Sequence, residues 1–251
     1  MHRQAVKEAL EARKPPPLPY ADTVGGFFDS LPSVCCPLSA HIYAAKGGRF
    51  MAVRIFIDQG HNPQGVNAGA EGFGYREQDI NYAIGILLRD ILLEDGRFEV
   101  RTSRNTPEES LGTSNTTSLL ARVTAANRWD ADYFISIHCN AGVSAAANGT
   151  AAYVFRLGST AADLGQAMLS AVVGQLGTKD NGVIANPSLY VLRRTRMPAV
   201  LMELAFITND EDVQKLVNEQ YAFAYALYTG ICRFLGYTPN IAEGSRTPIG
   251  F

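Results

Sequence analysis

The sequence predicts one α/β domain, with a single mostly parallel central sheet of about six strands flanked by helices. Three observations lead to this fold class. From residue 53 onward, short runs of β-branched and aromatic residues alternate with longer stretches of helical periodicity. The 251 residues, 47% of them hydrophobic, suffice for one core of ordinary size. Strands separated by helices favour a sandwich whose sheet is largely parallel.

The expected elements follow one another along the chain. We expect strands at 53–58, 98–102, 133–138, 151–155, 189–192 and 199–204, and helices at 77–93, 119–129, 161–176 and 210–235. The last helix is expected to break near Asn218. In helix 77–93 the apolar residues form one amphipathic stripe that faces the sheet, made of Ile80, Ile84, Leu87, Leu88 and Ile91.

The two ends of the chain differ from this middle part. Residues 1–50 contain Pro15-Pro16-Pro17 and scattered Gly and Ser without a sustained period. We expect a folded domain at 51–237, an N-terminal extension at 1–50 and a loose tail at 238–251. Two hypotheses fit the extension: a disordered or partner-binding arm, or upstream sequence misassigned ahead of a true start at Met51.

Composition and charge argue against several classes of partner. The formal net charge is −2, which gives no electrostatic case for nucleic acid or an anionic membrane as the main partner. No apolar stretch approaches the roughly 20 residues of a membrane-spanning helix. The charged start lacks the apolar core of a secretory signal. We therefore expect synthesis in the cytoplasm, with any action outside the cell following lysis or non-standard export; the oligomeric state is left open.

Three of the apolar runs end in residues that can bind a metal ion or work beside one. They run into His61, His138 and Glu203. Ligands of open α/β sheets bind outside the carboxyl ends of the strands, so these side chains suggest a site. Each also has an ordinary structural explanation: a loop histidine, a hydrogen-bonded core histidine, and a carboxylate paired with a buried Arg193 or Arg194.

A fourth candidate, Glu77, opens helix 77–93 three positions before Ile80, on the stripe facing the sheet. Its ordinary explanations are a favourable helix-dipole position or an ion pair with Arg76. Two imidazoles and one carboxylate make a three-ligand zinc site with an open position, where the pKa of a bound water falls to about 7. A further carboxylate can carry the proton to a leaving amine, which is metal-assisted amide hydrolysis. Asp58 could orient the His61 imidazole.

The sequence blocks around these residues resemble those of a known family. The blocks are Ile55-Phe56-Ile57-Asp58-Gln59-Gly60-His61, Gly69-Ala70, Arg76-Glu77-Gln78-Asp79, Arg122, Ala126-Asn127, Ala131 to Ala141, Leu189 to Arg193 and Pro198 to Asn209. In this order they resemble the zinc-dependent N-acetylmuramoyl-L-alanine amidases, which cut bacterial cell wall. The resemblance covers about residues 53–236.

This resemblance implies an α/β fold around one zinc ion and a peptidoglycan or muropeptide substrate. His61, Glu77 and His138 would be the zinc ligands, and Glu203 the catalytic acid/base. Asn140 and Arg193 would be substrate contacts. The bond cut would join the lactyl group of N-acetylmuramic acid to the L-alanine of the stem peptide. Two alternatives stay open: a zinc peptidase or amidase acting on another amide, and a non-catalytic cell-wall binding protein on the same fold.

Overall fold

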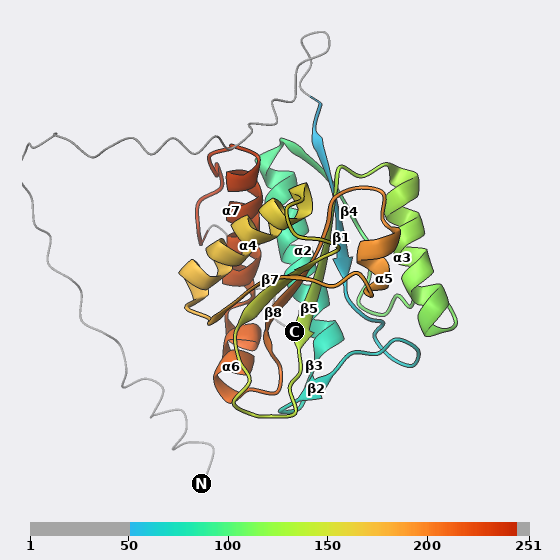
Figure 1. The fold of residues 1–251 in the computed structure, drawn as a ribbon, viewed down its shortest axis with the longest axis vertical. Coiled ribbons are helices and arrows are strands. Elements are labelled where there is room, and N and C mark those ends of the chain that lie inside the picture. Colours follow the sequence, from blue (N-terminus) through green and yellow to red (C-terminus); the bar gives the residue numbers. More distant parts are fainter. Residues whose placement is uncertain (1–50, 245–251) are drawn as a thin grey trace, which may run out of the picture. The chain divides into compact units, whose positions relative to one another are not determined.

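A six-stranded sheet forms the centre of the computed structural model, which describes residues 51–244 (Figure 1). The strand order is β4-β1-β5-β8-β6-β7. The strands are β1 (Val53–Gln59), β4 (Phe98–Thr102), β5 (Tyr133–Asn140), β6 (Thr150–Val154), β7 (Asp180–Ala185) and β8 (Ala199–Phe206). The extension predicted at 1–50, with both hypotheses for it, lies outside the described residues.

Four strands of the sheet run in one direction and two in the other. β4, β1, β5 and β8 pair in parallel, whereas β6 pairs antiparallel to β8 and parallel to β7. The mostly parallel sheet is therefore confirmed. Apart from this sheet, a small antiparallel hairpin of β2 (Glu71–Gly72) and β3 (Tyr75–Arg76) leads directly into the first described helix.

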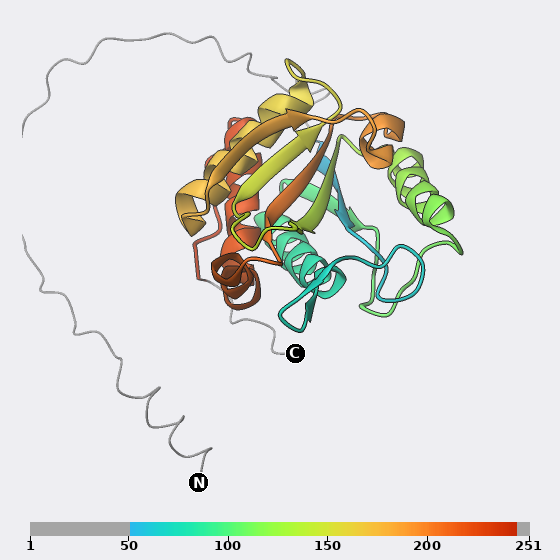
Figure 2. The ribbon, with the colours of Figure 1, turned by 60° about the horizontal axis from the view of Figure 1, so that its bottom comes forward.

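Helices cover both faces of the sheet (Figure 2). On one face lie α2 (Glu77–Asp95), α4 (Thr160–Leu176) and α7 (Gln220–Phe234), whose apolar side chains form the larger core cluster. On the other face lie α3 (Asn115–Trp129) and α5 (Tyr190–Arg194), over a smaller cluster around Phe56 and Phe134. The expected break near Asn218 is confirmed, because α6 (Asp210–Asn218) ends there before α7 begins. None of the helices in residues 51–244 is long and apolar enough to cross a bilayer.

One predicted strand was wrong. Residues 189–192 do not form a strand but open the short helix α5, and β7 takes the sixth place in the sheet. A four-residue apolar run has the same appearance in a short buried helix and in a strand, and here Val191 and Leu192 pack against the smaller cluster. β7 was missed because it is an edge strand whose residues are exposed or only half-buried, so it carries no apolar run.

The segment after α7 is held by the body of the domain as far as it is described. Arg97 donates a hydrogen bond to the Thr238 carbonyl, and Tyr225 donates one to the Ile241 carbonyl. Asn240 donates from its side chain to the Asp95 carbonyl. Residues 238, 240 and 241 of the predicted loose tail make these hydrogen bonds, and residues 245–251 lie outside the described part.

The strand register gathers polar side chains at one edge of the sheet. Successive residues of a strand point to opposite faces, so every second residue shares a face. His138 on β5 pairs with Glu203 on β8, and both point to the face that α3 and α5 cover. Asp58 and Ser136 lie opposite each other on the same face, one step earlier along β1 and β5.

Candidate metal centre

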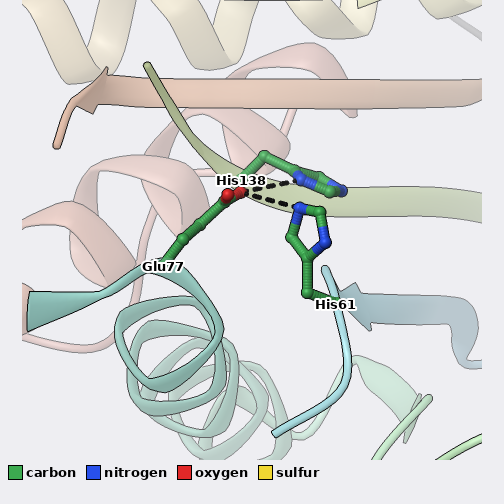
Figure 3. A group of neighbouring side chains, drawn as sticks. All are labelled: His61, Glu77 and His138. Atoms are coloured by element: carbon green, nitrogen blue, oxygen red, sulfur yellow. Dashed lines mark hydrogen bonds and ion pairs between the residues drawn. The ribbon is translucent and has the colours of Figure 1, made fainter. Parts of the chain in front are cut away.

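Three of the sequence-predicted ligands meet at the carboxyl ends of β1 and β5 (Figure 3). Glu77 Oε1 lies 3.1 Å from His61 Nε2 and 3.0 Å from His138 Nδ1. One donor atom from each of the three side chains lies within 4.8 Å of the other two. Glu77 is buried, and the two imidazoles are about one-fifth exposed (22% and 17%), so the group is open to solvent on the histidine side.

The Glu77 carboxylate is fixed by the main chain around it. Oε2 accepts a hydrogen bond from the Ala70 amide, and Oε1 accepts one from the Cys139 amide. The Asn81 side chain donates a further bond to Oε1 from the next turn of α2. Burial alone would raise the pKa of Glu77, but the hydrogen bonds to His138 and His61 outweigh it and hold the pKa well below its usual range. Glu77 is therefore ionised and held in a fixed orientation, as a metal ligand would need to be.

His61 follows β1 in an unusual backbone conformation, with φ at +69°. Its Nδ1 lies 3.2 Å from the Asn67 carbonyl. A proton on Nδ1 would donate to that carbonyl and leave the lone pair of Nε2 directed at Glu77. This is the arrangement in which a histidine binds a metal ion, with its second nitrogen held by an outer partner.

The loop that carries His61 is held from below by Arg122 of α3. The guanidinium is 1% exposed and donates to the carbonyls of Gln59, at 2.6 Å, and His61, at 2.5 Å. It also forms a buried ion pair with Asp58 at 2.6 Å, and Asp58 accepts a bond from Ser136. The hypothesis that Asp58 orients the His61 imidazole directly is thus corrected: its carboxylate binds Arg122, which holds the main chain of His61.

His138 is positioned by close contact with Gly60. A Cβ atom on Gly60 would lie 2.4 Å from Cε1 of the His138 ring, so only glycine leaves room for the imidazole. The rings of His61 and His138 meet edge to face, with centroids 4.8 Å apart. Burial alone would lower the pKa of His138, but the hydrogen bond to Glu77 raises it.

Glu203 stands across from His138 on β8, and its charge acts on both His138 and Glu77. One of its carboxylate oxygens, Oε2, is sealed from solvent and has no hydrogen-bond partner among residues 51–244. No ion pair in that range involves Glu203, so the pairing with Arg193 or Arg194 is not found. Burial raises the pKa of Glu203 to about 7, with His138 opposing the shift and Glu77 adding to it. A carboxyl with this pKa can both take and give a proton at neutral pH.

The donor set suits a divalent transition metal. Two imidazole nitrogens and one carboxylate oxygen are the ligands of many catalytic zinc sites, which keep a fourth position open. Here the three donors converge and outer partners fix their orientation, and Glu203 lies across from His138 with an Oε2 that has no hydrogen-bond partner in residues 51–244. The residues therefore fit a zinc ion, and the arrangement can support hydrolysis of an amide or ester.

The two weaker candidates lie on different elements. Asn140 ends β5, where its Oδ1 accepts a hydrogen bond from the Ala141 amide and the side chain is half-exposed. Arg193 is an exposed residue of α5, on the face of the sheet that α3 also covers. Their roles as substrate contacts stay predictions.

Comparison with known sequences identifies relatives. Residues 55–233 match the family described as N-acetylmuramoyl-L-alanine amidase. The chain is 38% identical over 170 residues to the YqiI protein of Bacillus subtilis, covering 66% of this chain and 76% of that one. It is 32% identical over 194 residues to the N-acetylmuramoyl-L-alanine amidase CwlM of Bacillus licheniformis, covering 76% of this chain and 72% of the relative.

Comparison with solved structures agrees. The crystal structure of the N-acetylmuramoyl-L-alanine amidase from Clostridium difficile 630 superposes with a TM-score of 0.65 and 31% sequence identity. The match covers 74% of this chain and 97% of that structure. The similarity therefore extends over nearly the whole of the solved amidase.

Proposed function

Because this chain belongs to the family of N-acetylmuramoyl-L-alanine amidases, which hydrolyse peptidoglycan, we propose that it does so with a zinc ion held by His61, Glu77 and His138. The bond hydrolysed joins the lactyl group of N-acetylmuramic acid to the L-alanine of the stem peptide. The observation that carries the zinc proposal is the convergence of three donor atoms within 4.8 Å, beside a carboxylate whose Oε2 is sealed from solvent and has no hydrogen-bond partner among residues 51–244.

The zinc ion, when bound, would polarise the scissile carbonyl and lower the pKa of a nearby water molecule. Glu203 would then take a proton from the attacking water and deliver it to the leaving amine nitrogen of alanine. Burial raises the pKa of Glu203 above its usual range, which favours a carboxyl that both takes and gives a proton. The buried pair of Arg122 and Asp58 keeps the His61 loop in place during the reaction.

The bond assignment is tested by mass spectrometry of digested peptidoglycan. We expect free stem peptides that begin with L-alanine, together with glycan strands of undiminished length. Cleavage within the stem peptide or between sugars would contradict the assignment and favour another hydrolase on this scaffold.

The zinc proposal is tested with two variants and a metal measurement. The purified parent should carry about one zinc per chain. Glu203→Gln should keep that zinc and lose at least about 100-fold in turnover, because only the proton carrier is removed. His138→Ala should lose zinc and activity together. Full turnover by Glu203→Gln would remove Glu203 from the proton-transfer role, and zinc retention by His138→Ala would refute the ligand set.

A further inference from the structure

The hairpin in front of Glu77 has a strained residue at its tip. Its two-residue loop consists of Phe73 and Gly74, with φ at +51° and +82°. A turn with positive φ at both positions is the type I′ turn, for which Asn-Gly is strongly preferred. An aromatic side chain in the left-handed region is an outlier. Phe73 is 56% exposed, so burial of its side chain in the core does not offset the free-energy cost of this backbone conformation.

This hairpin contacts Glu77 at its base and the segment that follows β8 along its side. At its base, Glu77 donates from its amide to the Ala70 carbonyl, and Ala70 donates back to the Glu77 carboxylate. Along its side, a Cβ atom on Gly72 would lie 2.2 Å from the carbonyl oxygen of Ile207, just beyond the end of β8. The hairpin therefore lies at the edge of the sheet where β5 and β8 deliver His138 and Glu203 (Figures 1 and 2).

Other exposed apolar side chains occur on loops at the same edge. Tyr75 of the hairpin is 40% exposed. Val66, in the loop after β1, and Val143, in the loop after β5, are exposed as well. Together with Phe73, these residues place exposed apolar side chains on three separate segments at this edge of the sheet.

We propose that Phe73 is a substrate-binding residue, whose ring packs against peptidoglycan next to the scissile amide. The inference rests on the proposed function. Sugar rings and alanyl methyl groups both offer apolar faces that an aromatic ring can cover. Strain that the fold does not need persists where it serves a ligand. Asparagine at position 73 would then suit the turn better than phenylalanine but would bind peptidoglycan less tightly.

The test separates stability from binding, in a Glu203→Gln background that leaves the substrate uncut. Phe73→Asn should raise the unfolding temperature, because Asn-Gly suits the turn. It should also weaken co-sedimentation with insoluble peptidoglycan by at least about fivefold. Phe73→Trp should bind like the parent. The matched control is Phe155→Asn, because Phe155 is also exposed (44%). It follows β6, which runs antiparallel to β8 and so ends at the opposite edge of the sheet. Binding of the Phe155→Asn variant to peptidoglycan should not change.

Three outcomes would overturn the inference: unchanged binding by Phe73→Asn, a lowered unfolding temperature, or a loss of zinc that accompanies the loss of binding. The last would assign Phe73 to support of Glu77. Competition with peptide-free glycan and with glycan-free stem peptide shows which part of the substrate the Phe73 ring covers. The competitor that carries this part should displace the protein with Phe73 from peptidoglycan more strongly than it displaces Phe73→Asn, and the other competitor should displace both equally. Failure of the chain with Glu203 intact to cleave peptidoglycan would refute the proposed function, whereas cleavage together with unchanged binding by Phe73→Asn would refute this inference alone.

Discussion

A single arginine connects the buried Asp58 to the main chain of His61, which we propose as a metal ligand. Arg122 is almost fully enclosed, and its guanidinium spans Asp58 and the carbonyls of Gln59 and His61. His61 occupies the left-handed region at φ +69°, which costs about 1–2 kcal/mol and persists because contacts with its surroundings offset that cost. Because a planar guanidinium can bind several acceptors in fixed directions, arginine suits this place and lysine does not.

We predict that Arg122→Lys lowers zinc affinity about tenfold, because a lysine ammonium can pair with Asp58 but cannot also hold both carbonyls. Chelator competition measures the affinity, and the absorption spectrum of the cobalt-substituted protein reports ligand geometry. The control is Arg97→Lys, which weakens another arginine–aspartate pair, with Asp95. If both variants lose stability equally and neither loses zinc affinity, Arg122 has only a structural role.

At the scale of elements, the contact between α4 and α7 depends on one glycine. A Cβ atom on Gly230 of α7 would lie 2.5 Å from the Cα of Met168 on α4. The two helices therefore approach through backbone atoms, and their apolar residues complete the larger core cluster behind the sheet. The strands that carry His138 and Glu203 rest on this cluster.

We predict that Gly230→Ala destabilises the domain by about 2 kcal/mol, because the added methyl group forces the helices apart. Gly174→Ala is the matched control on α4, where a Cβ atom would meet nothing within 4 Å. That change should stabilise by about 0.5 kcal/mol or more through helix propensity. Denaturant midpoints measure both, and equal effects of the two substitutions would contradict the close packing.

At the scale of the whole domain, a buried network joins the end of α2 to the C-terminal segment. Tyr228 donates to Asp95 at 2.6 Å, and Asp95 pairs with Arg97 at 2.5 Å. Asn240 donates from its amide to Tyr228. Burial alone would raise the pKa of Asp95, but the hydrogen bonds from Arg97 and Tyr228 outweigh it, so that the pKa is lowered.

A lowered carboxyl pKa in the folded state means that the unfolded chain binds more protons in acid. The stability contributed by Asp95 is thus present above its unfolded pKa of about 3.9 and is lost as pH falls further. We predict that Asp95→Asn is about 1–3 kcal/mol less stable at pH 7. The difference from the parent should shrink between about pH 5 and pH 3. A constant difference in unfolding free energy over this range would contradict the assignment.

The family match at 55–233 falls inside the range 51–237, which we propose as the catalytic domain. Within it, sequence periodicity located the long helices and five of the six sheet strands, because buried apolar runs reflect the core directly. It misassigned 189–192 and missed β7, because a short run and an edge strand carry too little apolar signal. The β2–β3 hairpin was missed as well, since its tip lacks the usual Asn-Gly.

The sequence by itself determined the fold class and named His61, Glu77 and His138 as candidate metal ligands, because the apolar runs and the sequence blocks typical of the family are local features. Only the tertiary structure decided how these residues are supported. Asp58 proved to bind Arg122, which lies 64 positions further along the chain and holds the main chain of His61. Glu203 proved to lie across from His138, with its oxygen Oε2 sealed from solvent and without a hydrogen-bond partner among residues 51–244. Burial, register and long-range hydrogen bonds come from packing of distant segments, and no local pattern in the chain specifies them.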